Sequence, residues 1–409
     1  MQNRDDELPL AGCKVIEFSH MVMGPSTGLI LADLGADVIK VEPLGGDHTR
    51  QLLGSGSGYF PMFNRNKRSI AIDLKREEGV AAAVRLIDGA DVLVENFRPG
   101  ALAKLGLGPD RFAQSNPGLI YYSAKGFLGG PYENRTALDE VAQMMGGLAY
   151  MTGPPGRPLR AGASVIDIAG GMFGVIGILA ALQQRGKTGR GAQVRSSLFE
   201  SSAFFVGQHM AQMAVTGQAA RPMPERISAW AIYDVFETAD PDEKIFVGVV
   251  SDGQWRSFVE HFDLGAMGSD PALATNNDRV RARDTLLPAV RALFAPMRRD
   301  ALIKRLEAAG VAFAPITRPE DLFDDPHLNA NGGLVDVTLE DGSETRLPVV
   351  PIELDGDLPR QRRDLPRPGD DTLAVLEQYG FARPEIEALL DAGVVMSGKQ
   401  PADLASGQS

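Results

Sequence analysis

The sequence predicts an α/β protein with a parallel sheet, followed by a smaller α+β region. Three observations lead to this fold class. In the first third of the chain, strand-like segments alternate with helix-like segments, which is the pattern of βαβ units. Near Ser228 the pattern changes to paired strands and clustered helices. A chain of 409 residues is also too long for one small core, so two domains are expected.

The first third supplies the elements of the predicted sheet. Short apolar runs rich in valine and isoleucine, such as DVIKVE, indicate buried strands. The predicted strands are Lys14–Phe18, Asp37–Glu42, Ser69–Leu74, Asp91–Glu95 and Leu119–Ala124, and helices are predicted at Thr27–Leu34 and Glu77–Asp88. Ligands of such sheets bind beyond the carboxyl ends of the strands. The polar turns at 20–25, 95–100 and 125–130 are therefore candidate site segments.

The later chain divides into three stretches. Apolar helices are predicted at Met172–Gln184 and Ser196–Val215, joined by a glycine-rich turn at 186–191. A break at Gly217–Glu225 leads to a predicted α+β domain at 228–331. Its expected elements are two antiparallel strands and three helices, at Ala231–Thr238, Lys244–Val250, Gly253–Phe262, Val280–Phe294 and Arg299–Ala309. From Gly333 onwards, strand-like segments and many prolines lead to a helix at Thr372–Tyr379.

Charge and cysteine content narrow the class of protein. The net charge of −12 argues against nonspecific binding to nucleic acid or to an anionic membrane. A single cysteine, Cys13, forms no internal disulfide and fits a reducing compartment. The segment 1–9 lacks the pattern of a signal peptide, and the apolar stretch at 172–182 is short for a membrane span. We therefore expect a cytoplasmic protein with neither a nucleic-acid nor a membrane partner.

Asp167 is the residue whose position is hardest to explain by packing alone. It follows the apolar, strand-like run Ala163–Ile166 and precedes the glycine-rich start of a helix at 168–174. An aspartate there can cap the helix by accepting backbone N–H groups. It can also be a nucleophile, because neighbouring glycines let a substrate approach closely. Local sequence alone favours the cap.

The other polar motifs point less clearly to chemistry. The glycines at 45–58 match neither a phosphate-binding loop nor a dinucleotide-binding turn. The five histidines are scattered without metal-ligand spacing, so no metal site is expected. The cations within 64–68 are either a solvated edge or a phosphate contact. Asn96 and Phe97 follow a predicted strand and offer an amide and a flat ring, as a capped turn or as a ligand contact.

Five sequence blocks, taken together, resemble one family. They are VIEFSHMVMGP with LADLGADVIKVEP, NRNKRSIAIDLK, DVLVENFRPG, NPGLIYYSAKGF, and GASVIDIAGGMFGVIGILAALQQRGKTGRGAQV. In order and spacing they resemble the class III coenzyme A transferases of the CaiB/BaiF type, which include formyl-CoA transferase, carnitine CoA-transferases and α-methylacyl-CoA racemases. The resemblance implies a Rossmann-like large domain formed by residues 1–227 and 332–409, with the small domain 228–331 inserted. It also implies a homodimer of two interlocked subunits.

The resemblance changes the interpretation of Asp167, which falls on the family's catalytic aspartate. The implied reaction begins when the carboxylate attacks an acyl-CoA thioester, giving a mixed anhydride and CoA thiolate. The thiolate then forms an aspartyl-CoA thioester, and an acceptor acid repeats the steps in reverse. A helix start at Gly170–Gly171 would steady the charge through its dipole. No permanently bound cofactor is implied, because coenzyme A and acyl-CoA are substrates.

The resemblance also implies two sets of contact residues. For CoA they are His20, Met21, Met23, Ile72, Leu74, Lys75, Asn96, Phe97, Lys104 and Lys125. For the acceptor pocket they are Val22, Arg135, Leu138, Asp139, Arg160, Gly253 and Gln254. Val22 and Leu138 stand where formyl-CoA transferase has glutamine and tyrosine, and segment 250–255 has one glycine where that enzyme has several. Specificity for formyl-CoA and oxalate is therefore not expected.

Two alternatives to CoA transfer follow from the same residues. A racemase needs a second base, which its branch of the family takes from a Gly-His-Asp triplet. The corresponding triplet here is Ala137-Leu138-Asp139, and leucine carries no proton, so transfer is favoured. The other alternative is an acyl-CoA-binding protein without turnover, against which the retained Asp167 argues. Small dicarboxylates or hydroxyacids are the expected substrates, with Arg135, Arg160 or Arg226 pairing with a distal carboxylate.

Overall fold

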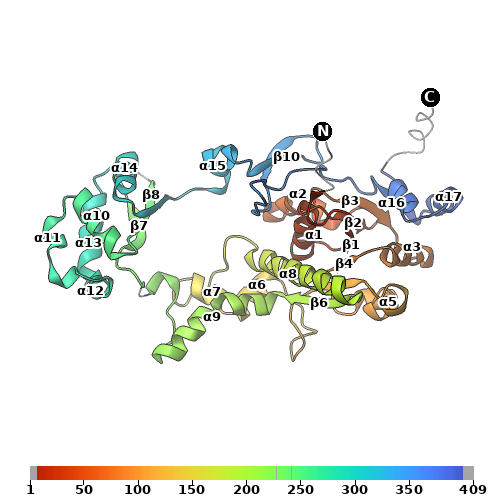
Figure 1. The fold of residues 1–409 in the computed structure, drawn as a ribbon, viewed down its shortest axis with the longest axis horizontal. Helices are drawn as coiled ribbons and strands as arrows, with labels where there is room; N and C mark the ends of the chain where they lie inside the picture. The colour runs from red at the N-terminus through yellow and green to blue at the C-terminus, as the bar shows by residue number, and fades with distance from the viewer. Residues whose placement is uncertain (1–6, 227, 241, 399–409) are drawn as a thin grey trace. The chain divides into compact units, whose positions relative to one another are not determined.

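A computed structural model describes residues 7–226, 228–240 and 242–398 of the chain. The chain divides into two compact units. The first combines Met1–Pro224 with Pro326–Ser409, and the second is Glu225–Asp325 (Figure 1). The second unit therefore interrupts the first in sequence, with boundaries close to those expected for an inserted domain at 228–331.

A parallel sheet forms the centre of the first unit. Within the described residues its seven strands lie in the order β12-β3-β2-β1-β4-β5-β6, and all neighbours are parallel except β12 and β3. The bounds are β1 Lys14–Phe18, β2 Asp37–Glu42, β3 Arg68–Ile72, β4 Val92–Glu95, β5 Ile120–Lys125, β6 Ala192–Ser197 and β12 Val395–Met396. The order 3-2-1-4-5-6 is that of doubly wound dinucleotide-binding folds. The predicted parallel α/β sheet is confirmed.

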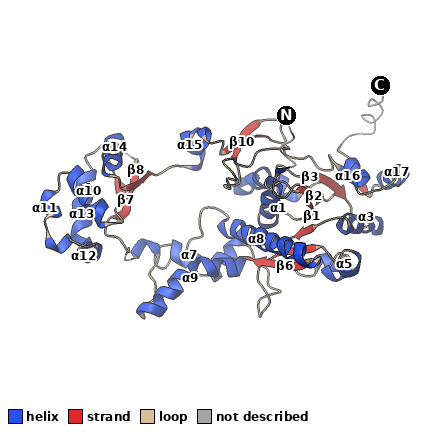
Figure 2. Cartoon of the chain, in the orientation of Figure 1, coloured by secondary structure: helices blue, strands red, loops and turns tan. Residues whose placement is uncertain are grey.

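Helices cover the sheet in two groups, each with its own apolar core, and Figure 2 shows the blue helices around the red strands. One apolar core joins the sheet to α3, α5, α16 and α17, and another joins it to α1, α6 and α8. The helices of the first unit are α1 Met23–Asp33, α2 Tyr59–Phe63, α3 Glu77–Asp88, α4 Ala101–Lys104, α5 Pro109–Ser115, α6 Asp139–Met145, α7 Leu148–Thr152, α8 Val165–Thr188, α9 Leu198–Thr216, α15 Pro326–Ala330, α16 Thr372–Gln378 and α17 Arg383–Asp391. A hairpin of β10 Leu334–Thr338 and β11 Glu344–Pro348 completes the unit.

The second unit is a small α+β structure with its own core. Its antiparallel sheet has the order β7-β8-β9 among the described residues. Phe236, Phe258 and Phe294 are fully buried, and the ring of Phe294 contacts the other two edge to face. The elements are β7 Tyr233–Glu237, β8 Lys244–Gly248, β9 Ala312–Pro315, α10 Asp252–His261, α11 Gly265–Gly268, α12 Asn276–Arg281, α13 Arg283–Phe294 and α14 Arg299–Ala309.

Several expected elements differ in the structure, and two of them lie near the candidate site. The run Ala163–Ile166 is not strand-like: helix α8 begins at Val165 with Ser164 at its N-cap, so Asp167 lies in the first turn. The predicted helix at 196–215 starts later, because residues 192–197 form the edge strand β6 beside β5. The alternating exposure of β6 is typical of an edge strand, and its short polar sequence gives little warning of it.

Helix α8 is longer than the helix predicted at 172–184, and its apolar part extends beyond the stretch at 172–182. Its most apolar 18 residues have a mean hydropathy of 2.2, which by length and composition alone is enough to cross a membrane. However, 44% of that window is buried against the rest of the first unit, chiefly against α1, β5 and β6. The core helices of soluble proteins pass the same test, so length and composition alone do not make α8 a membrane span.

Candidate active site

The candidate site begins at the N-terminus of α8, where Asp139 holds the first turn of the helix. Its Oδ2 accepts the backbone N–H groups of Ile166 at 2.9 Å and Asp167 at 3.1 Å. The remaining first-turn N–H groups, of Val165 and Ile168, donate to Ala163 and Ser164. These four amides are therefore already satisfied, and an oxyanion at Asp167 needs a donor from elsewhere. Asp139, not Asp167, is the carboxylate that caps the helix.

Asp139 is in turn fixed by its neighbours. It is buried at the start of α6, and its Oδ1 accepts Nε2 of Gln143 at 2.5 Å. Nη2 of Arg160 lies 3.6 Å from the same oxygen. Oε1 of Gln143 accepts the backbone N–H of Ala161 at 2.8 Å, which ties the loop before α8 to α6. Asp139 lies 27 and 28 positions before the two residues whose N–H groups it accepts, so local sequence patterns do not predict this cap.

The environment of Asp167 changes its acidity. Burial, together with the negative charge of Asp139, raises the pKa of Asp167 to about 7, although the Arg160 guanidinium opposes this shift. A carboxyl group with such a pKa is partly ionised near neutral pH and is a stronger base than an ordinary aspartate. Perturbed carboxyl groups of this kind cluster at functional sites, so Asp167 is the leading candidate for the reactive group.

The glycines after Asp167 serve helix packing. A Cβ atom on Gly170 would lie 2.6 Å from Cε of Met23, and one on Gly171 would lie 2.2 Å from Oγ of Ser26. At Gly171 a Cβ would also lie 2.9 Å from the backbone carbonyl oxygen of Met23, so α1 approaches α8 too closely there for a larger residue, whereas the flexible Met23 side chain could move away from a Cβ at Gly170. The expectation that these glycines make room for substrate is therefore replaced by a packing role. The same contact places the start of α1 beside the start of α8.

A second group of candidate residues meets at the carboxyl ends of β1 and β4. The backbone N–H of His20 donates to Oδ1 of Asn96 at 3.0 Å, and Nδ2 of Asn96 donates to the carbonyl of His20 at 2.7 Å. The rings of His20 and Phe97 lie 5.4 Å apart. Burial lowers the pKa of His20, which favours a neutral imidazole. Four predicted CoA contacts, His20, Met21, Asn96 and Phe97, are thus brought together.

Glu95 lies in the candidate segment 95–100 but was not predicted as a site residue, and it binds side-chain and backbone groups at the same strand edge. It is buried at the end of β4 and accepts Nζ of Lys125 at 2.6 Å and the backbone N–H of Phe97 at 2.9 Å. A cavity of about 170 Å³ opens beside this pair. Its walls include Glu95, Arg98, Tyr121, Ser123, Lys125 and Arg195. A glutamate that ends a buried strand was the available sequence signal.

The remaining predicted CoA residues are spread more widely. Leu74, Lys75 and Lys104 follow β3 or end α4, and both lysines are exposed. Strand β2 separates β3 from β1. The edge from β3 to β5 spans about 19 Å at ordinary strand spacing, so the residues that follow β3 lie farther along the edge than His20 and Asn96. The side chains of Met23 and Ile72 are buried in the two main cores. Burial of these two side chains favours backbone rather than side-chain contact, and a CoA contact at either position stays a prediction.

The predicted acceptor residues also differ in placement. Val22 is buried against Leu29, Phe63 and Val350, and its role in the acceptor pocket stays a prediction. Leu138 is 61% exposed at the N-cap of α6. Arg160 contacts Asp139, as described above. The guanidinium of Arg135 lies 4.9 Å from the ring of Tyr132.

Gly253 and Gln254 belong to the second unit. They lie in the first turn of α10, where Oε1 of Gln254 accepts the N–H of Val250 and its Nε2 donates to the carbonyl of Gly310. Arg226, also in this unit, has its guanidinium 5.7 Å from the ring of Tyr233. These side chains have partners within the second unit, and their acceptor-site role stays a prediction.

The fold and the site define an α/β protein with a high-pKa carboxylate in the first turn of a core helix and a polar strand edge. The model of CoA-transferase family III matches residues 10–372. The chain is 35% identical to a succinate–glutarate CoA-transferase of Agrobacterium fabrum, covering 90% of this chain and 95% of that protein. It is 33% identical to an acetyl-CoA:oxalate CoA-transferase of Acetobacter aceti, covering 92% and 97%.

Solved structures give the same result. The structure of a CaiB/BaiF family protein from Brucella suis superimposes with a TM-score of 0.79 at 33% identity, covering 91% of this chain and 99% of that chain. The chain belongs to CoA-transferase family III, and it is a CoA-transferase. The family resemblance inferred from the sequence is confirmed.

Proposed function

We propose that this enzyme moves CoA from an acyl-CoA thioester to a carboxylic acid through covalent intermediates on Asp167. An oxygen of the Asp167 carboxylate attacks the thioester carbonyl, and the C–S bond breaks to give an acyl-aspartyl anhydride and CoA thiolate. The thiolate attacks the aspartyl carbonyl, which releases the first acid and leaves an aspartyl-CoA thioester. The acceptor carboxylate attacks this thioester and expels CoA thiolate, which gives a second anhydride between the acceptor and Asp167. The thiolate then attacks the acceptor's acyl carbonyl, forming the product acyl-CoA and freeing the Asp167 carboxylate.

The observation that carries this proposal is the environment of Asp167. A pKa of about 7 combines an ionised fraction at neutral pH with higher basicity than an exposed aspartate has. Both properties suit a carboxylate nucleophile. The polar strand edge at His20, Asn96 and Phe97 supports a CoA site in the same unit.

Trapping the intermediates tests the proposal. Wild-type protein incubated with succinyl-CoA and then hydroxylamine is expected to carry a hydroxamate on Asp167, detected by intact-mass and peptide mass spectrometry. The Asp167→Asn variant, which keeps the size of the side chain, is expected to carry none. A variant that still binds CoA serves as its own folding control. Turnover without any adduct on Asp167 in the wild type would refute the covalent route.

We further propose small dicarboxylates or hydroxyacids as substrates, with Arg160 pairing with the distal carboxylate. Arg160 is about one-third exposed, and its charge reaches both Asp139 and Asp167. Several relatives are named for dicarboxylates, including succinate, glutarate and mesaconate. An arginine can bind a carboxylate through two parallel hydrogen bonds, which discriminates a diacid from a monoacid.

Substituting Arg160 is expected to weaken the diacid acceptor selectively. In Arg160→Gln the KM for glutarate should rise about 10- to 100-fold, as when a charged hydrogen bond worth about 1.5–3 kcal/mol is lost. The KM for butyrate, which has no second carboxylate, should change less than about threefold. Steady-state kinetics with both acceptors measure this. Equal losses for both acids would show that Arg160 acts only through Asp139 and Asp167.

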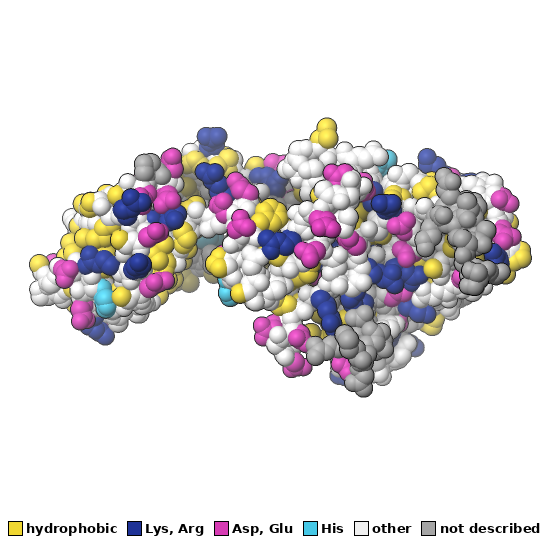
Figure 3. Space-filling view, turned by 90° about the horizontal axis from the view of Figure 1, so that it is seen from above, with side chains coloured by type: hydrophobic (Ala, Val, Ile, Leu, Met, Phe, Trp, Pro, Cys, Tyr) yellow, Lys and Arg dark blue, Asp and Glu magenta, His cyan; other side chains and the backbone are white. Residues whose placement is uncertain are grey.

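We also propose a cytoplasmic homodimer with interlocked subunits. Met172, Ile176 and Leu179 form an exposed apolar stripe on α8, at the spacing of one helix face. On α9, Phe204 is 71% exposed and Met210 66% exposed. Apolar faces of this extent are typical of protein interfaces. The face seen in Figure 3 carries interspersed acidic and basic side chains, as expected of a protein surface in water.

A further inference from the structure

The turn after β1 has an unusual backbone conformation. Met21 has φ of +63°, in the left-handed region that side-chain-bearing residues rarely adopt. The turn occupies the carboxyl end of a central strand and contains two of the predicted CoA contacts, His20 and Met21. Strain of this kind persists only where surrounding groups enforce it, and it concentrates at functional sites. Side chains from outside the turn therefore have to hold it in this conformation.

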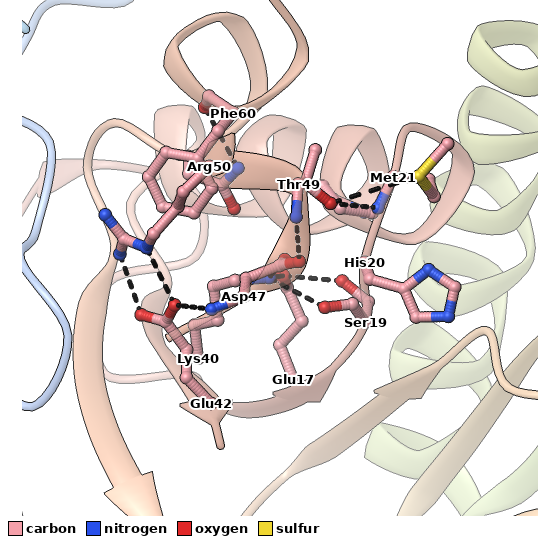
Figure 4. Close-up of polar contacts among 12 residues, drawn as sticks. Glu17, Ser19, His20, Met21, Lys40, Glu42, Asp47, Thr49, Arg50 and Phe60 are labelled. Carbon is pink, nitrogen blue, oxygen red and sulfur yellow. Dashed lines mark hydrogen bonds and ion pairs between the residues drawn. The ribbon is translucent and has the colours of Figure 1, made fainter. Parts of the chain in front are cut away.

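Three side chains from outside this turn, those of Asn96, Thr49 and Lys40, hold its consecutive backbone groups. Asn96 engages both the N–H and the carbonyl of His20. The N–H of Met21 donates to Oγ1 of Thr49 at 3.0 Å, and the Thr49 hydroxyl also lies 4.0 Å from Sδ of Met21. Nζ of Lys40 donates to the carbonyl of Ser19 at 2.7 Å. Figure 4 shows Thr49 and Lys40 reaching the turn from the segment 40–49.

Thr49 and Lys40 are linked through Asp47. Oδ1 of Asp47 accepts the N–H of Thr49 at 2.9 Å, which caps the short 3-10 helix η2, His48–Gln51. Oδ2 of Asp47 lies 2.9 Å from Nζ of Lys40 (Figure 4). The N–H of Asp47 donates to Oε2 of Glu42, at the end of β2. The segment after β2 is thus fixed from both ends, and Thr49 is presented to the turn.

The burial of this network needs an explanation. Lys40 lies within the central strand β2 and is 1% exposed, and Thr49 and Asp47 are also buried. Burial disfavours charge on Lys40, but Glu17, Asp47 and Glu42 outweigh it and raise its pKa above the ordinary value. Buried ion pairs are often no more stabilising than apolar side chains of the same volume. Stability alone is therefore a weak reason for this arrangement, whereas the contacts of Lys40 with Ser19 and of Thr49 with Met21 define the geometry of the turn.

We propose that Thr49, supported by Asp47 and Lys40, is a positioning residue that holds the His20–Met21 turn in the conformation required for CoA binding. The inference rests on the proposed function of this strand edge. The Thr49 hydroxyl engages the backbone N–H and the sulfur of Met21, so it acts on the ligand through the turn. It therefore affects the binding of CoA more than the chemistry at Asp167.

The test compares Thr49→Val and Thr49→Ser. Valine keeps the shape of threonine but removes the acceptor for the Met21 N–H, whereas serine keeps the hydroxyl. In Thr49→Val the Kd for CoA, measured by titration calorimetry, and the KM for succinyl-CoA should rise about tenfold, with kcat within about threefold of wild type. Thr49→Ser should return both constants to within about threefold of wild type. Thermal melting of each variant reports on stability.

Thr188→Val is the matched control. The Thr188 hydroxyl accepts the N–H of Arg190 at 3.2 Å at the far end of α8, so the same chemical change is made away from the turn. It should leave the Kd for CoA unchanged. A Thr49→Val protein that melts lower but binds CoA like wild type would overturn the inference, as would a loss in kcat alone or equal losses in both Thr49 variants. Failure of the wild type to bind CoA would instead overturn the proposed function, and this inference with it.

Discussion

Asp167→Asn is expected to lose CoA transfer and to become more stable at alkaline pH. Without a nucleophilic carboxylate, kcat should fall by at least about 10⁴-fold, in line with the removal of other covalent nucleophiles. At pH 8.5 the free energy of unfolding should rise by about 2–4 kcal/mol, because asparagine carries no charge that burial and Asp139 oppose. Urea unfolding at several pH values measures the second effect.

The pH dependence of this stabilisation follows from the sign of the shift. The pKa of Asp167 is about 7 in the folded protein and 3.8 is the ordinary value, so folding disfavours its ionised form. The wild type therefore loses stability as the pH rises from about 4 to about 7, and the full loss is present above pH 7. The difference between Asp167→Asn and wild type should vanish near pH 4. A destabilised variant at pH 8.5 would contradict the raised pKa.

Asp110→Asn is the control for this measurement. Asp110 is an exposed aspartate in the first turn of α5, so it shares the position in a helix with Asp167 but not the burial. Its replacement should change the free energy of unfolding by less than about 1 kcal/mol, through the helix dipole alone. A rise as large as that of Asp167→Asn would point to a general charge effect.

Asp139→Ala is expected to lower stability and to change the pH profile. Two N–H groups at the start of α8 lose their acceptor, which should reduce the free energy of unfolding by about 2 kcal/mol. The negative charge that raises the pKa of Asp167 also disappears. Because the ionised form of Asp167 is the nucleophile, the acid limb of kcat/KM should move to lower pH.

Asp139→Asn separates these two effects. Its side-chain oxygen still accepts hydrogen bonds from the helix, so most of the stability should return, but the charge is removed. The acid limb should therefore stay shifted to lower pH in both variants. The pH dependence of kcat/KM for succinyl-CoA is the measurement. An acid limb that coincides with wild type in Asp139→Asn would rule out Asp139 as a source of the raised pKa.

The sequence predicted the elements whose patterns are strong and local. Strands β1 and β2 and helix α3 have the predicted bounds, because their apolar residues recur with a clear period and their ends carry glycine or charged residues. The start of α8 was misplaced because a short apolar run before a helix does not distinguish strand from helix. What decides it is the contact with Asp139, which belongs to another helix.

The reactive group of the candidate site could be predicted from the sequence, but the residues that position the site's other parts could not. Asp167 stands out through its residue type beside apolar and glycine-rich segments, and the family resemblance gives it a role. Lys40, Asp47 and Glu95 were not singled out, because a charged residue in a predicted strand is ordinarily placed on a solvated face. Their partners lie on other strands or turns, so burial of these charges becomes evident only when the sheet is assembled.

The strand beside β3 comes from the opposite end of the chain. Val395 pairs with Ile72, and the N–H of Ser69 donates to Asp371. During synthesis, β3 leaves the ribosome long before its neighbour β12 exists. At about 5–20 residues per second this interval lasts on the order of tens of seconds. The nascent chain thus presents an open sheet edge to other chains throughout that time, which makes premature termination before β12 a direct route to aggregation.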